Sequence, residues 1–89
     1  MEFEKLYQSP NFEKNERIVK KNHDERCVCC NKPMKSSDVK YWVHMTTDWE
    51  MTNASEEELS QSGYESQGCF PVGSECAKKI DKKFIIVYN

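Results

Sequence analysis

Hydrophobic and polar residues alternate most clearly over residues 39–46. One set of alternate positions is Val39, Tyr41, Val43 and Met45, and the other is Lys40, Trp42, His44 and Thr46. This period of two predicts a β-strand that turns one face towards a core. Thr47 and Asp48 suit a turn, and residues 49–52 then predict a returning strand. The segment is therefore expected to form a β-hairpin.

The last third of the chain predicts a helix followed by a strand. Ser74 is a suitable N-cap for a helix over residues 75–82. Residues 84–88 are the most β-prone run in the chain and predict a closing strand, or else an exposed edge. Residues 69–73 are expected to be a short extended piece, and Pro71 keeps it out of a central strand position.

The remaining segments are mostly polar. Ser55 and Glu58 have the spacing of a capping box, which predicts a helical turn over residues 56–60 and a loop over 61–68. Residues 1–26 are rich in charge of both signs. Ser9 and Pro10 can open a helix there, so this segment is either a docked helix or a partly disordered arm. We expect an N-terminal arm over residues 1–26 and a compact domain over residues 27–89.

Composition makes the core of this domain thin. The chain has 89 residues, of which 37% are hydrophobic and 31% charged, and its net charge is −2. A single small α+β domain with so little apolar surface usually needs a metal or disulfides for stability. The charge balance is not that of a dedicated nucleic-acid-binding protein.

The five cysteines favour a metal. Met1 to Lys5 contains no apolar run after a basic start, so no secretory signal is expected, and no segment is apolar enough for a membrane span. We therefore expect a cytoplasmic protein, inside a bacterium or a host cell. Thiols in that compartment bind metals more often than they form disulfides, and an odd cysteine count fits a closed disulfide set poorly.

Cys27 and Cys30 have the Cys-x-x-Cys spacing that lets one tight turn place two thiolates on an ion. Asn31 follows, and asparagine tolerates the left-handed backbone of such a knuckle. Cys76 is the best third ligand, because it falls in the first turn of the expected helix, where a thiolate is favoured. A knuckle, a hairpin and then a helix that carries a ligand is the order of a treble-clef zinc finger.

The fourth ligand is left between His44, on the expected hairpin, and Cys69, close before the expected helix. Either choice gives a closed, structural zinc site. Cys29 is interpreted as a buried or unligated thiol, and His23 as part of the polar arm. Two other interpretations stay open: the cysteines are unrelated buried thiols, or Cys27 and Cys30 are a redox pair, although the βαβ context of redox pairs is missing.

Three blocks carry a resemblance to known proteins: Cys-x-x-Cys-Asn-Lys-Pro at residues 27–33, Tyr-Trp-Val-His at 41–44, and Gly-Ser-x-Cys-Ala-Lys-Lys-Ile at 73–80. Over residues 27–80 the chain resembles short zinc-finger-like proteins of bacteria, bacteriophages and other mobile elements. The resemblance implies a zinc-binding protein with four ligands and implies no activity. The ligands that it implies are Cys27, Cys30, His44 and Cys76. The acidic insert at residues 53–66 departs from the pattern.

The chain lacks the residues of an obvious catalytic site, so we expect a non-enzymatic module that binds a protein partner, with a host protein as the target if the source is a phage or mobile element. The residues expected to contact that partner are Trp49, Glu56, Glu57, Glu58 and Tyr64. The alternative is weak nucleic-acid binding through the C-terminal lysines Lys78, Lys79, Lys82 and Lys83.

Overall fold

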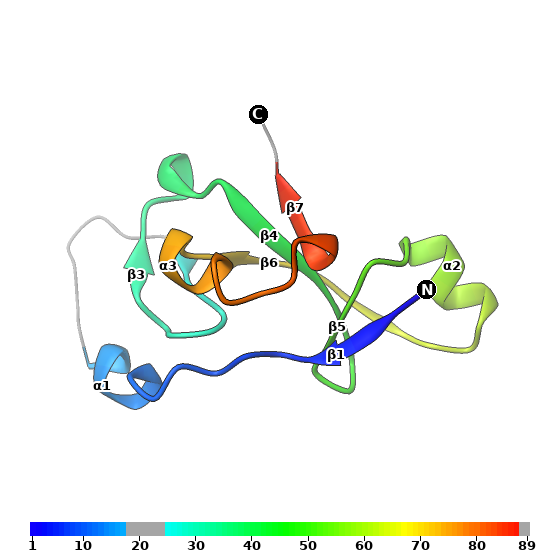
Figure 1. The fold of residues 1–89 in the computed structure, drawn as a ribbon, viewed down its shortest axis with the longest axis horizontal. Coiled ribbons are helices and arrows are strands. Elements are labelled where there is room, and N and C mark those ends of the chain that lie inside the picture. Colours follow the sequence, from blue (N-terminus) through cyan, green and yellow to red (C-terminus); the bar gives the residue numbers. More distant parts are fainter. Residues whose placement is uncertain (18–24, 88–89) are drawn as a thin grey trace.

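The computed structural model describes residues 1–17 and 25–87, and these residues form a small α+β fold (Figure 1). One sheet has the strand order β1-β5-β4-β6, and β7 also pairs with β4. A second sheet is the short hairpin of β2 and β3. The α+β class is confirmed.

The strands are β1 (Phe3–Lys5), β2 (Glu25–Arg26), β3 (Pro33–Met34), β4 (Tyr41–Thr46), β5 (Glu50–Thr52), β6 (Ser66–Val72) and β7 (Ile85–Val87). The helices are α1 (Phe12–Glu16), α2 (Glu56–Gln61) and α3 (Ser74–Ala77), with single 3-10 turns η1 (Ser36–Asp38) and η2 (Lys82–Phe84).

Strand β4 is the centre of the larger sheet. One of its edges pairs with β6 along its whole length, from Tyr41 opposite Val72 to Thr46 opposite Ser66. The other edge is shared, because β7 pairs with residues 41–43 and β5 pairs with residues 44–45. The predicted hairpin of residues 39–52 is thereby confirmed.

The expected division of β4 into a buried and a polar face is only partly correct. Val43 and Met45 are fully buried, as the alternation predicts. His44 and Thr46, from the opposite face, are nearly as buried. His44 contacts Ala54 and Ser66, which lie on either side of α2 in the sequence. The segment around α2 therefore covers the face that a simple alternation assigns to solvent.

The acidic segment after β5 packs onto the sheet through Ala54 and Leu59, which are both buried. Ser55 and Glu58 form the predicted capping box: the Ser55 hydroxyl accepts from the Glu58 amide over 3.1 Å, and the Glu58 carboxylate accepts from the Ser55 amide over 3.2 Å. Leu59 is fully buried and anchors α2. The predicted helical turn is confirmed, and the segment is a docked part of the fold.

The C-terminal part differs from the prediction in its helix. The helix ends at Ala77 instead of residue 82, and its N-cap is Gly73 instead of Ser74. The chain turns again at Asp81, whose carboxylate accepts from the Lys83 amide over 3.1 Å and caps η2. The expected closing strand is present as β7, while Tyr88 lies outside the described residues.

Strand β6 is longer than expected, since it begins at Ser66 inside the predicted loop. It lies at the edge of the larger sheet, which is where a strand tolerates Pro71. The Pro71 carbonyl accepts from the Val28 amide over 2.9 Å. This bond ties the sheet edge to the segment that contains Cys27 and Cys30.

The N-terminal segment contains a strand that the pattern did not predict. Residues 3–5 pair with β5, and the Phe3 ring lies 4.7 Å from the ring of Tyr64. Figure 1 shows the N-terminus beside α2. Helix α1 begins after Asn11 instead of Ser9. Residues 18–24 of the expected arm lie outside the described residues.

Candidate metal centre

Cys27 and Cys30 occupy the turn between β2 and β3. The Cys27 amide donates to the Lys32 carbonyl over 3.0 Å, and the Asn31 amide donates to the Cys27 carbonyl over 2.7 Å. Asn31 has a φ of 63°. This is the left-handed conformation predicted for the residue after Cys30, and asparagine adopts it at lower cost than most residues. The turn is a compact knuckle that holds both thiols on one side.

Cys76 completes a group of three sulfur atoms. The Sγ atoms of Cys27, Cys30 and Cys76 all lie within 4.8 Å of one another. Bonds of about 2.3 Å to one zinc ion place sulfur atoms about 4 Å apart, so this group fits a metal ion with small adjustments. Cys27 and Cys76 are buried and Cys30 is half-buried. The described residues thus include three thiols that can hold a metal ion.

Hydrogen bonds concentrate negative charge on Cys27. A hydrogen bond from the Cys29 thiol, opposed by burial, lowers the pKa of Cys27 to about 4. The amide of Gly73, at the start of α3, also donates to Cys27 Sγ over 3.2 Å. Backbone amides of Cys30 and Cys29 add to this effect. Donors of this kind around a ligand sulfur orient it and stabilise its thiolate form.

The other two thiols of the group are held in the neutral form while no cation is present. Burial, followed by the charge of Cys27, raises the pKa of Cys76 to about 12. Burial likewise raises the pKa of Cys30. A second and third negative charge beside the Cys27 thiolate are unfavourable in water-poor surroundings, and a divalent cation removes that penalty. The group therefore has the chemistry of a cation site.

Cys29 is closer to this group than the sequence indicated. It is fully buried, and its pKa is raised first by its hydrogen bond to Cys27 and then by burial. Its interpretation as a buried thiol agrees with the structure, but its role as a donor to a ligand sulfur was missed. Nothing in the Cys-x-Cys-Cys pattern indicates whether Cys29 donates to a ligand sulfur or has no role in the site.

The structure does not bring His44 to the three cysteines. Its Nδ1 donates to the Ala54 carbonyl over 2.8 Å, and because a carbonyl oxygen only accepts, this nitrogen carries hydrogen. Its Nε2 then accepts from the Ser66 hydroxyl over 2.6 Å. The expectation of a His44 ligand therefore needs correction: β4 directs the ring towards the α2 segment, where it connects two backbone stretches.

Cys69 also lies outside the group of three. It is opposite His44 in the β4–β6 ladder and is exposed. Neither residue expected as the fourth ligand is brought to the site. His23, the remaining weaker candidate of the sequence, lies outside the described residues.

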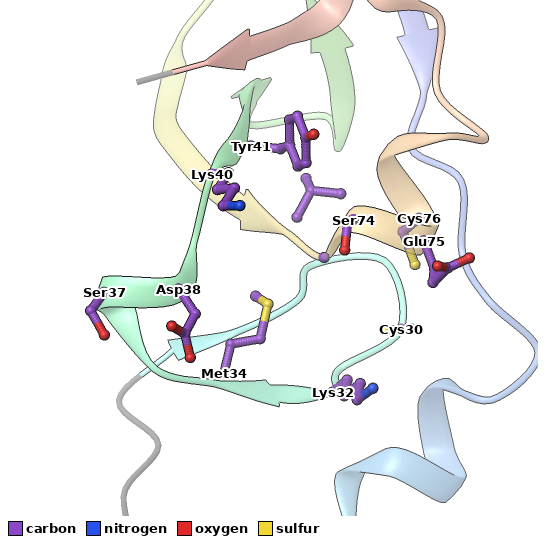
Figure 2. Close-up of a pocket in the computed structure, with 12 residues that line it drawn as sticks. Cys30, Lys32, Met34, Ser37, Asp38, Lys40, Tyr41, Ser74, Glu75 and Cys76 are labelled. Atoms are coloured by element: carbon purple, nitrogen blue, oxygen red, sulfur yellow. The ribbon is translucent and has the colours of Figure 1, made fainter. Parts of the chain in front are cut away.

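A pocket of about 450 Å³ opens beside two of the three thiols. Cys30 and Cys76 line it, together with the oppositely charged side chains of Lys32, Asp38 and Lys40. Figure 2 shows Cys76 and Ser74 on α3 opposite Met34 on β3, with Asp38 on η1 and Tyr41 on β4 around the same space. The metal group is therefore open to this pocket on one side.

The residues expected to contact a partner are spread over the turn after β4 and the α2 segment. Trp49 is 55% exposed and has a φ of 60°, and Tyr64 is 41% exposed. Glu56, Glu57 and Glu58 are exposed in the first turn of α2, where the helix dipole stabilises acidic side chains. Glu58 already belongs to the capping box, so Glu57 is the acid least involved in the fold.

The C-terminal lysines are largely occupied by partners within the chain. Lys79 Nζ donates to the Tyr7 hydroxyl over 3.1 Å, and Lys83 Nζ lies 3.1 Å from the carboxylate of Glu2. Lys78 pairs with Glu75 over 3.4 Å. Pairs this exposed add little stability, but the two carboxylates offset the charges of Lys78 and Lys83, whereas Lys79 keeps its full charge beside a neutral hydroxyl.

No protein family, curated protein or solved structure matches this chain. The resemblance to short zinc-finger-like proteins stays a prediction. Within residues 1–17 and 25–87, no helix has the length and apolar character needed to cross a membrane.

Proposed function

We propose that the chain is a non-enzymatic interaction module whose fold is held by one zinc ion on Cys27, Cys30 and Cys76. The observation that supports this best is the grouping of three sulfur atoms within 4.8 Å, contributed by a knuckle and by a helix far from it in the sequence. Without an ion, two buried or half-buried thiols beside one thiolate are a poor way to join two segments. With an ion, they become the strongest connection between them.

Zinc is the metal that this donor set favours. Thiolates are soft ligands that select zinc, copper(I) or iron–sulfur clusters, and zinc is the usual ion of structural cysteine sites built on a knuckle. The order of knuckle, β4–β5 hairpin and helix start supports a treble-clef-like arrangement. Helix α3 has only one turn, so it contributes a single ligand where a longer helix could contribute two.

A protein partner is supported by an exposed aromatic side chain and an exposed acid, on the turn after β4 and on α2. Trp49 is held in the left-handed conformation with more than half of its surface exposed, and Glu57 is fixed on a short docked helix. Strained backbone at an exposed aromatic residue is more common at binding sites than elsewhere. Nucleic-acid binding has less support, because two of the four lysines form ion pairs with carboxylates of the chain and few uncompensated positive charges are left.

The partner proposal is tested by affinity capture with zinc-loaded protein from a bacterial lysate. We expect a protein retained in fixed stoichiometry by the wild type, lost with Trp49→Ala or Glu57→Lys, and unchanged with Lys14→Glu on α1 as the matched surface control. Nuclease treatment of the lysate should leave the capture unchanged. If all variants retain the same proteins, or if nuclease removes them, the protein-interaction proposal is contradicted.

A further inference from the structure

We propose that a small thiol bearing a carboxylate binds in the pocket beside Cys30 and Cys76 and places its sulfur on the metal as an additional ligand. This inference rests on the proposed function, since it requires a metal on the three cysteines. It adds a ligand site to a centre that would otherwise only hold the fold together. The pocket, its charges and the donor set each contribute to the argument.

The pocket connects the metal group to solvent. Cys30 and Cys76 both line the pocket. Cys27 does not line it, because Gly73 and Cys29 cover its sulfur. The pocket volume of about 450 Å³ lies within the range of sites that hold small molecules. A ligand in this space therefore approaches the metal group from the side of Cys30 and Cys76.

The donor set leaves a place for such a ligand. Zinc in thiolate sites is almost always four-coordinate. Among residues 1–17 and 25–87, the ligating group has three members, and both His44 and Cys69 lie elsewhere. Glu75, the acid next to Cys76, is directed to a different partner because it pairs with Lys78 over 3.4 Å and is largely exposed.

Two lysines at the pocket can bind an anionic group of a ligand. Lys32 and Lys40 line the pocket against Asp38, while the charge of Glu75 is offset by Lys78. Lys32 and Lys40 are thus the positive partners that the pocket offers to a carboxylate on the ligand. A thiolate matches the soft character of the metal site, and a carboxylate on the same molecule complements the lysines. A small thiol acid satisfies both requirements, and an aminothiol satisfies only the first.

Cobalt(II) provides the test, because its thiolate charge-transfer band grows with each sulfur ligand. Wild-type protein loaded with one cobalt(II) per chain is titrated with 3-mercaptopropionate, and with cysteamine as the matched aminothiol. We expect the band to rise by about one third at saturation, as three sulfur ligands become four. The 3-mercaptopropionate should saturate at a lower concentration than cysteamine. Metal in the filtrate after centrifugal filtration measures whether the thiol merely removes the ion.

Substitutions in the pocket check that the thiol binds there. Lys32→Gln and Lys40→Gln should each weaken binding of 3-mercaptopropionate about two- to fivefold, the scale of an exposed ion pair, and leave cysteamine binding unweakened. Lys82→Gln, outside the pocket, should change neither. Circular dichroism confirms that each variant keeps the wild-type fold.

An unchanged band in the presence of both thiols would overturn the inference, as would transfer of the cobalt to the filtrate. A His23→Ala variant whose cobalt spectrum loses a nitrogen-type ligand would also overturn it, because the chain itself would then fill the position. Failure of the proposed function looks different, since no charge-transfer band would form before any thiol is added.

Discussion

The amide of Gly73 donates a hydrogen bond of 3.2 Å to the sulfur of Cys27. The bond joins the residue that caps α3 to the first cysteine of the knuckle, so it connects the two segments that also supply the metal ligands. Such a donor both orients a ligand sulfur and reduces the cost of its negative charge. The position of Gly73 therefore matters to the site although it is not a ligand.

Gly73→Pro should weaken metal binding about 10- to 100-fold, the range found when a partner of a metal ligand is removed. Proline lacks the donor and places its ring towards the sulfur, while the φ of −66° at this position suits proline. Gly73→Ala is the control, since its new Cβ would meet its nearest neighbours at 3.8 Å, an ordinary contact. Competition with a chromophoric zinc chelator measures both. Equal affinity for the two variants would show that the bond is unimportant.

His44→Ala should leave one metal ion per chain and lower the free energy of unfolding by about 2–4 kcal/mol. The Ala54 carbonyl loses its partner in the interior, and a cavity replaces the ring, while the Ser66 hydroxyl keeps the Gly68 amide as a donor. Urea unfolding of the zinc-loaded variant gives the stability, and native mass spectrometry gives the metal content. A variant that stays folded but loses its metal would restore His44 as a ligand.

The fold could be predicted from the sequence where a local pattern coincides with the final packing. The alternation in β4 and the Ser55 and Glu58 spacing each specify an element from a few adjacent residues. Strand β1 has no such signal, because Phe3 is one apolar residue among charges and becomes a strand only by pairing with β5. Helix α3 was predicted too long, since residues 78–82 have helix-forming side chains but Asp81 caps a new turn.

The cysteines of the site were predictable and the histidine was not. The spacing of Cys27 and Cys30 and the place of Cys76 at a helix start are properties of short segments. The direction of His44 depends on which segment covers the second face of β4. That segment contains the acidic insert, whose docking through Leu59 is a tertiary contact. A residue pattern of the strand alone cannot distinguish a ligand from a buried hydrogen-bonding ring.

Acid should release the metal at a higher pH from Cys29→Ala than from the wild type. The Cys29 thiol is the largest of the hydrogen-bond donors that lower the pKa of Cys27 to about 4, against an ordinary value of 9.0. Because the pKa of Cys27 is lower in the folded state, its thiolate stabilises that state most at pH values above the ordinary pKa. This contribution is lost as the pH falls through about 4. Without the donor the pKa of Cys27 rises, so protons compete with the metal at higher pH.

Cys29→Ser is the matched variant for this titration, because its hydroxyl can still donate to Cys27. Zinc release is followed with a dye while the pH is lowered stepwise. The pH at which half of the zinc is released should be highest for the alanine variant. The serine variant and the wild type should release it at lower pH values that lie close together. Identical midpoints for all three proteins would contradict a role of Cys29 in stabilising the thiolate.

Trp49→Gly should unfold at a higher denaturant concentration than Trp49→Ala, by about 1 kcal/mol in stability. Both variants lose the ring, which lies 6.2 Å from the ring of Phe70, but only glycine accepts a φ of 60° without strain. The difference between the two isolates the backbone cost that the native tryptophan tolerates. If the alanine variant is as stable as the glycine variant, the turn relaxes and no strain is present at Trp49.

The metal content and folding of the same sample test the central claim most directly. Native mass spectrometry of protein purified without added metal, combined with circular dichroism before and after chelation, measures both. The account predicts one zinc per chain, loss of the native spectrum on chelation and its return with added zinc. It also predicts that Cys76→Ser loses the zinc and that Cys69→Ser keeps it. A wild-type protein that is folded and free of metal would contradict the account.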